Sequence, residues 1–214
     1  MIDFIATHSP LPVLTNEDRT YIADNFYTLE ELCLGRTGTP AECRSQIRAG
    51  LLPRPAYVVD GTEMYPAGFF LFPDSAGHLG ARMKDEFGAR YVRAAKVYGD
   101  SPSGDRIASE YAAYLSGEYA VCLRFLSPET IFLKEFAITK IQELLATPNP
   151  SDTDWSAALR NWVTRLAGME REFAPCDTAR FGSLPSRVRY IKNVREKFPS
   201  CFLQAAQEIA KTDF

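Results

Sequence analysis

Apolar residues recur at helical spacing through most of the chain after Gly77. The clearest stripe has an apolar residue every three or four positions, which places one face of a helix against a core, and it consists of Trp155, Leu159, Trp162, Leu166, Met169 and Phe173. Clusters of Gly, Pro, Ser and Asp separate the helical segments. The pattern predicts helices near residues 79–98, 103–115, 128–145, 152–173, 186–198 and 201–211.

The first third of the chain is divided by helix caps. Thr28 with Glu31, and Thr39 with Glu42, have the spacing of a capping box, in which the two side chains satisfy free amides at the start of a helix. Two short helices are therefore expected, and they follow an earlier short helix. The three predicted ranges are 16–26, 29–34 and 40–49.

A hairpin is predicted beyond these helices. Residues 57–59 and 64–65 flank Asp60-Gly61, a pair that readily adopts the positive φ angles of a tight turn. The sequence therefore predicts a mainly α protein with two parts. An N-terminal winged-helix-like module with a short β-hairpin occupies residues 1–73, and it packs on a C-terminal helical bundle at residues 74–214.

The predicted module resembles the start of MerR-type regulators. The similarity runs from Tyr27 to Tyr65 and includes Arg44 in the second helix and the turn Gly50-Leu51-Leu52-Pro53. In that family the second helix enters the DNA major groove and the wing contacts phosphate, which requires Lys and Arg. Residues 1–73 hold five arginines, no lysine and nine acids. DNA is therefore a disfavoured partner.

The rest of the chain carries a second resemblance. Its motifs are Tyr114–Arg124, Ser127-Pro128-Glu129 with Lys134, the Trp155 helix, and the stretch from Asp177 through Arg180-Phe181-Gly182 to Ser186-Arg187. In this order they resemble DUF6058, a family of uncharacterised bacterial proteins that is associated with natural-product biosynthesis. The resemblance implies a setting and no particular chemistry.

Length and composition limit the number of cores, the location of the protein and the kinds of site it can hold. The chain has 214 residues, 46% of them hydrophobic, and a net charge of −3, which allows one core or one core with a small appended module. Its apolar runs are far shorter than the roughly 20 residues of a membrane span, and its first residues lack the basic start of a targeting signal. We therefore expect a cytoplasmic protein without a membrane partner. Its five scattered cysteines and two histidines have no metal-ligand spacing, so neither a metal nor a cofactor of its own is expected.

Three residues are candidates for catalysis. Cys122 lies in the family-like motif, and a thiolate suits acyl transfer from a thioester. Glu129 follows seven residues later, and His78 is the histidine best placed to be a general base near neutral pH. For each residue a structural alternative stays open, since Cys122 falls in an apolar run and His78 lies between glycines.

Five residues are candidates for substrate binding. Arginine suits carboxylate or phosphate groups, so the basic C-terminal quarter would also suit an acidic carrier-protein helix or its phosphopantetheine arm. The candidates are Tyr119, Arg124, Asp177, Arg180 and Arg187. The last three could instead form a structural ion-pair network between two helices.

The leading hypothesis is a protein of antibiotic-type biosynthesis that condenses an aminoacyl group, held on a carrier protein, with an amine, as lincosamide pathways do. Carrier protein and small-molecule substrate are then its partners. The alternatives are a MerR-like regulator with a ligand-sensing helical part, and a non-catalytic scaffold of a biosynthetic complex. The oligomeric state is left open.

Overall fold

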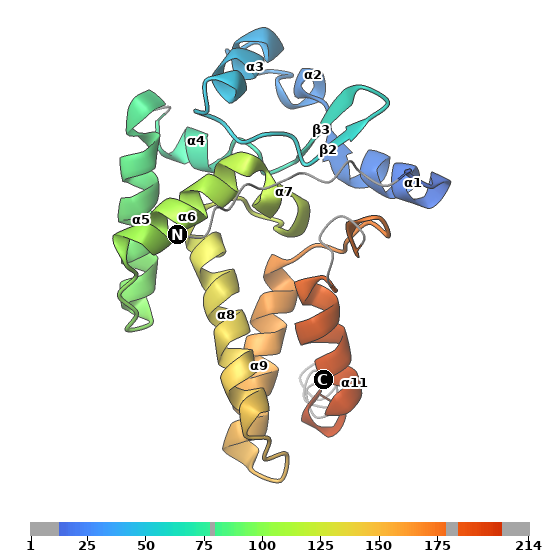
Figure 1. Ribbon diagram of the computed structural model, residues 1–214, viewed down its shortest axis with the longest axis vertical. Coiled ribbons are helices and arrows are strands. Elements are labelled where there is room, and N and C mark those ends of the chain that lie inside the picture. Colours follow the sequence, from blue (N-terminus) through green and yellow to red (C-terminus); the bar gives the residue numbers. More distant parts are fainter. Residues whose placement is uncertain (1–12, 78–79, 179–183, 203–214) are drawn as a thin grey trace, which may run out of the picture.

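The computed structural model describes residues 13–77, 80–178 and 184–202. Within these ranges the protein is mainly helical and has one small antiparallel sheet, as the sequence predicts. Figure 1 shows the sheet and the first short helices together at one end of the molecule, and the long helices extending toward the other.

Short elements make up the first third of the chain. They are α1 (Asn16–Asn25), β1 (Phe26–Tyr27), α2 (Leu29–Leu32), α3 (Pro40–Arg48), β2 (Tyr57–Val59), β3 (Thr62–Pro66) and α4 (Leu71–Ser75). The capping boxes predicted at Thr28 and Thr39 both form. At the hairpin turn, Asp60 and Gly61 have φ angles of 50° and 82°, and β2 pairs with β3 in an antiparallel hairpin, as predicted. The short strand β1, which the sequence did not predict, pairs with the other edge of β3.

Longer helices follow. They are the 3₁₀ turn η1 (Gly80–Arg82), α5 (Met83–Val97), α6 (Gly104–Ser116), α7 (Glu118–Cys122), α8 (Pro128–Ala146), α9 (Thr153–Met169), the π-helix η2 (Arg187–Lys192) and α11 (Asn193–Lys197). The helix predicted at 201–211 lies almost wholly outside the described residues. The helix predicted at 152–173 ends at Met169, because Glu170 leaves the helix and forms an antiparallel bridge with Leu123.

The apolar stripe of α9 is confirmed as core. Trp155, Leu159, Leu166 and Met169 are buried, and Trp162 packs against the same core from a partly buried position. The stripe faces two neighbours, since α9 lies between α8 and the η2–α11 segment (Figure 1).

The early elements pack onto the helices through a shared core. The large core combines Ile22, Phe26 and Tyr57 from the first third with side chains of α5 through α9. A second, smaller cluster lies beneath α2 and α3 and includes Leu29, Cys43, Leu52, Tyr65 and Phe69. The boundary between residues 73 and 74 stays a prediction, since the large core crosses it.

Gly117 fixes how α7 meets the early elements. Its φ is +83°, and an added Cβ would lie 2.8 Å from the carbonyl oxygen of Arg54 and 2.9 Å from that of Pro55. A side chain would therefore be both strained and obstructed, and glycine alone fits. The Arg54 amide donates to the carbonyl of Leu115 at 2.9 Å, so the chain before the hairpin is held against the end of α6.

Candidate functional site

The short helix α7 places Tyr119 and Cys122 inside the protein. The Cys122 side chain is buried, and its thiol donates to the Tyr119 carbonyl oxygen at 3.7 Å. Burial raises the pKa of Cys122 to about 12, against a smaller opposing effect of the Lys134 charge. Because the thiolate is the reactive form, this environment does not activate Cys122 as a nucleophile near neutral pH.

Polar side chains meet around α7, although most of their surroundings are apolar. We call this group the polar cluster, and its members are Glu110 of α6, Tyr119 of α7, Lys134 and Glu135 of α8, Glu170 after α9, and Ser186 before η2. Five separate segments thus contribute to one site.

A chain of contacts links the members from α6, α7 and α8. The Tyr119 hydroxyl donates to the Glu110 carboxylate and lies 3.5 Å from Oε1 of Glu135. The Lys134 ammonium donates to the same Glu135 oxygen at 3.1 Å. It also lies 5.3 Å from the centre of the Tyr119 ring, within the range of a cation–π contact.

Glu170 is the most unusual member of the polar cluster. Its side chain is fully buried, at 0% exposure, and the Ser186 hydroxyl donates to its Oε1. Its other oxygen, Oε2, has no hydrogen-bond partner among the residues that the structure describes. Native proteins rarely leave a buried carboxyl oxygen unpaired, and each such atom calls for an explanation. A substrate group that donates to Oε2 would supply one.

The charges of the polar cluster influence each other. Burial raises the pKa of Glu170 above its ordinary value of 4.5, although Lys134, Ser186 and Arg187 oppose the rise. Burial raises the pKa of Glu110 in the same way. For Lys134, burial alone would lower the pKa, but the neighbouring acidic groups, among them Cys122 and Glu170, outweigh it and raise the pKa above 10.5.

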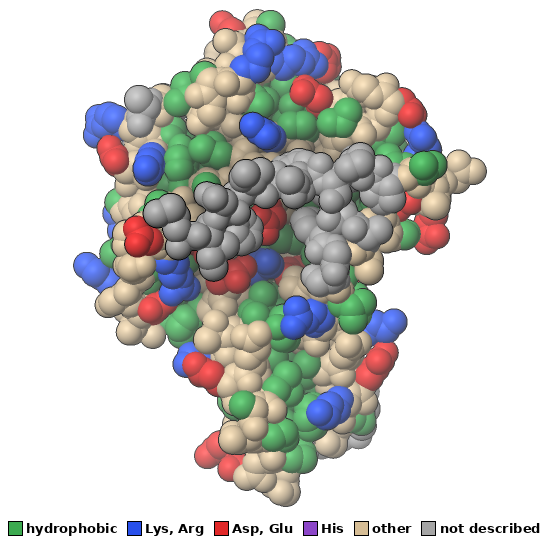
Figure 2. All heavy atoms as spheres, in the orientation of Figure 1, with side chains coloured by type: hydrophobic (Ala, Val, Ile, Leu, Met, Phe, Trp, Pro, Cys, Tyr) green, Lys and Arg blue, Asp and Glu red, His purple; other side chains and the backbone are tan. Residues whose placement is uncertain are grey.

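This arrangement is suited to proton transfer beside a fixed positive charge. A carboxyl group with a raised pKa holds a proton more readily than an ordinary carboxylate, as a general acid or base must, and a lysine held in its charged form can stabilise a developing oxyanion. The π-helix η2 begins directly after Ser186, and such helices occur frequently at functional sites. In Figure 2, acidic and basic side chains meet near the centre of the face shown.

Two of the predicted binding residues lie next to Glu170. Arg124 donates through Nε to the Glu170 carbonyl oxygen at 3.1 Å. The Arg187 guanidinium reaches the same oxygen at 3.3 Å and pairs with the carboxylate of Glu172. Both arginines thus hold the turn that follows α9, and neither hydrogen-bonds to the Glu170 carboxyl group in the described structure.

Two other candidates lie in separate contacts. Glu129 forms a two-pronged ion pair with Arg90, at 2.6 and 2.9 Å, which outweighs the effect of burial and lowers the pKa of Glu129. Asp177 is fully buried and accepts hydrogen bonds from the Tyr57 hydroxyl at 2.8 Å and from the Ala174 amide at 2.9 Å. Asp177 therefore ties the hairpin to the segment after α9.

His78 and Arg180 lie outside the described residues, so their roles stay predictions. Sequence reasoning missed the three carboxylates of the polar cluster. A signal was available for Glu135, since Lys134-Glu135 interrupts the apolar run of α8. Nothing in the local sequence marks Glu170 as buried.

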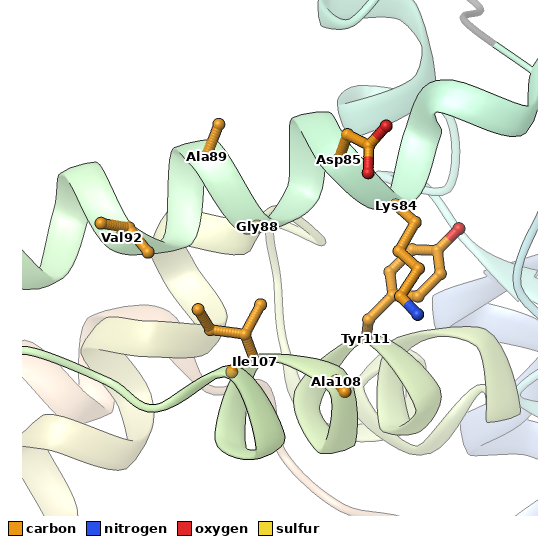
Figure 3. Close-up of a pocket in the computed structure, with 9 residues that line it drawn as sticks. Lys84, Asp85, Gly88, Ala89, Val92, Ile107, Ala108 and Tyr111 are labelled. Carbon is orange, nitrogen blue, oxygen red and sulfur yellow. The ribbon is translucent and has the colours of Figure 1, made fainter.

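An open groove lies between α5 and α6, and its volume is about 510 Å³. Figure 3 shows Lys84 and Tyr111 near one end of it and Val92 and Ile107 farther along. Small residues keep the two helices close, since a Cβ on Gly88 would lie 3.4 Å from Ile107. The lining is mostly small and uncharged, so the groove offers less acid–base chemistry than the polar cluster.

Two further properties concern the described residues as a whole. Among them, no group of three or more His, Cys, Asp or Glu side chains is placed to hold a metal ion. Their helices are either too short or too polar to cross a bilayer.

Comparison with known proteins gives one match. No match was found among the curated proteins, and none among the solved structures. The sequence profile of a family of unknown function, DUF6058, matches residues 84–199. This range includes every member of the polar cluster and covers more than half of the 214 residues. The chain therefore belongs to the DUF6058 family.

Proposed function

We propose that this protein forms amide bonds in natural-product biosynthesis, by condensing a thioester-held aminoacyl group with an amine. The biosynthetic setting rests on the resemblance of the sequence to proteins of such pathways. The chemistry rests on one observation: Glu170 is fully buried, and its Oε2 has no hydrogen-bond partner among the described residues. The charge of Lys134 lies near enough to influence the pKa of Glu170. In this proposal the polar cluster, and not a cysteine thiolate, drives the reaction.

The proposed reaction needs one base and one fixed cation. The Glu170 carboxylate takes a proton from the substrate ammonium, and the neutral amine attacks the thioester carbon, forming the C–N bond. The carbonyl electron pair moves to oxygen, where the Lys134 ammonium stabilises the negative charge. Collapse restores the C=O bond and expels the thiolate, which takes the proton from Glu170. The nitrogen releases its remaining extra proton to solvent, so the products are an amide, a thiol and a proton.

The test is condensation of aminoacyl N-acetylcysteamine thioesters with a panel of primary amines, followed by mass spectrometry of the amide. We expect Glu170→Gln to lower the rate about 10²–10⁴-fold, the usual contribution of a general base. Cys122→Ala is the matched control and should retain turnover. Full activity of Glu170→Gln together with loss of activity in Cys122→Ala would show that a covalent thiol route operates instead.

DNA binding has less support as a function. Arg44, on the helix that would enter the groove, is held by Glu30 at 2.8 Å and by Glu63 at 3.5 Å. An arginine engaged by two carboxylates is a poor partner for phosphate. An electrophoretic shift with DNA from upstream of the gene, weakening steeply with salt, would reverse this ranking.

A further inference from the structure

We propose that the η2–α11 segment is a docking surface for an acidic helix of a partner protein. Its exposed cations, which we call the basic face, are Arg189, Lys192, Arg195 and Lys197. A single acid, Glu196, lies among them in the sequence. The chain as a whole carries a net charge of −3, whereas the stretch from Arg189 to Lys197 holds four cations and one acid.

The cations of the basic face resemble other exposed basic side chains, such as Lys84 and Arg93, in forming no ion pair within the described residues, and they differ from the basic side chains that do pair. Arg36, Arg106 and Lys140 each form an ion pair with a nearby acid. None of the four cations of the basic face forms an ion pair with any residue in the described ranges. Their positive charge is therefore available to a partner.

Aromatic rings hold three of these side chains at the surface. Arg189 lies 5.1 Å from the Tyr190 ring centre, Arg195 lies 5.7 Å from that of Phe202, and Lys197 lies 5.4 Å from that of Phe198. A side chain that already rests on a ring loses less freedom when it binds. In Figure 2, Lys and Arg side chains are seen over the part of this view in which Figure 1 places α11.

The position of the basic face connects it with the polar cluster. Ser186, which donates to Glu170, directly precedes η2. A protein docked on the basic face would therefore sit beside the candidate reaction site. The kind of partner rests on the proposed function, because a thioester-held substrate must be delivered by the protein that carries it.

The size and setting of the basic face favour a protein helix over a nucleic acid or a membrane. The stretch from Arg189 to Lys197 spans about 12 Å as a helix, at about 1.5 Å per residue, which matches about two turns of a partner helix. The first 73 residues hold nine acids against five arginines, so a larger polyanion would meet repulsion elsewhere on the molecule.

The test measures binding of a fluorescein-labelled peptide of about 20 residues, long enough to be helical, with glutamates along one face. A triple variant removes charge from the basic face: Arg189→Gln, Lys192→Gln and Arg195→Gln. The matched control removes three exposed charges from α5: Lys84→Gln, Arg93→Gln and Lys96→Gln. Fluorescence anisotropy gives the Kd of each protein.

We expect the basic-face variant to raise the Kd about tenfold or more, as loss of three weak charge contacts implies, and the α5 control to change it less than about twofold. Raising NaCl from about 50 to about 300 mM should weaken binding to the unmodified protein. Equal weakening in both variants would reveal generic attraction and overturn the proposal. So would tighter binding of duplex DNA or of phosphatidylglycerol vesicles than of the peptide.

The docking test is independent of turnover. Glu170→Gln should bind the peptide as well as the unmodified protein does. Peptide binding that depends on the basic face, without any amide formation, would refute the proposed function and leave the docking surface standing. Amide formation from free thioesters, with peptide binding unaffected by the basic-face variant, would refute the docking surface and leave the proposed function standing.

Discussion

The ion pairs of the first third and the polar cluster of the helical part differ in how fully their charged side chains are paired and in how exposed they are. Arg19, Arg36 and Arg44 are each engaged by an acid of the same region, and at least one side chain in each pair is well exposed. The polar cluster holds three carboxylates and one ammonium, and within the described residues an oxygen of fully buried Glu170 has no hydrogen-bond partner. In the first third each of these arginines has an acidic partner, whereas the polar cluster has more hydrogen-bond acceptors than donors.

This difference concerns how fully each group of charges is paired within the described residues. Exposed pairs contribute little to stability, and water can replace either partner. A buried unpaired carboxyl group carries a real energetic penalty, so its presence points to a role that a satisfied structure would not need. Three predictions test the comparison, from the largest expected effect to the smallest.

The first prediction concerns Lys134, the cation of the polar cluster. Lys134→Met should lower the free energy of unfolding by about 2–3 kcal/mol, because buried Glu170 and partly buried Glu135 lose the nearby positive charge. Chemical denaturation monitored by circular dichroism measures the loss. Lys140→Met is the control, since Lys140 lies on the same helix in a half-exposed pair with Glu143 and should cost about 0.5 kcal/mol or less.

The double variant Lys134→Met with Glu170→Gln sharpens this result. Removing the Glu170 charge should restore part of the lost stability, since one fewer buried carboxylate then lacks a cation. If Lys134→Met lowers the free energy of unfolding no more than Lys140→Met does, the lysine of the polar cluster behaves like an exposed one, and the contrast between the polar cluster and the exposed ion pairs is wrong.

The second prediction concerns pH. The pKa of Glu170 is raised, so above 4.5 the folded protein keeps a proton that the unfolded chain has lost. Stability should therefore fall as the pH rises from 4.5 through the folded pKa, by about 1.4 kcal/mol for each tenfold difference in acidity between the two states. Glu170→Gln should reduce this fall, leaving the part due to Glu110, whose pKa is also raised.

Asp18 supplies the opposite case in the first third. Burial would raise its pKa, but hydrogen bonds from Thr15 and Cys176 outweigh burial and lower it below 3.8. Its contribution is present above 3.8 and is lost as the pH falls through the folded pKa. Asp18→Asn should therefore reduce the loss of stability in acid and leave the range above 4.5 unchanged. Thermal melts across pH 2–8 measure both effects. If Asp18→Asn and Glu170→Gln changed the stability in the same pH range, the predicted contrast between the two carboxyl groups would be wrong.

The third prediction concerns Arg44, whose side chain is 40% exposed and pairs with Glu30. Arg44→Ala should cost less than about 1 kcal/mol, and the cost should shrink further in high salt. Urea denaturation at low and high NaCl measures both effects. Arg48→Ala is the control, because Arg48 is exposed on the same helix. If Arg44→Ala instead lowered the free energy of unfolding by more than about 2 kcal/mol at both salt concentrations, the pair would stabilise the fold more than exposed pairs do, and the prediction would be wrong.

The fold could be predicted further from the sequence than the candidate site could. The capping boxes at Thr28 and Thr39, the Asp60-Gly61 turn and the stripe of α9 all follow from contacts within a few residues along the chain. The prediction was less accurate where a distant segment intervenes. The helix predicted to reach residue 173 stops at Met169 because Leu123 pairs with Glu170.

By itself, the sequence determined the order of helices, the hairpin and the resemblance to the family that the chain belongs to, because caps, turns and apolar periodicity act locally. Only the tertiary structure decided which groups could carry chemistry. It buries Cys122 so that its thiol keeps its proton, engages Glu129 with Arg90, and brings Lys134 near enough to Glu170 for each to influence the pKa of the other. Burial and pairing depend on residues far apart in the chain, and no local pattern contains them.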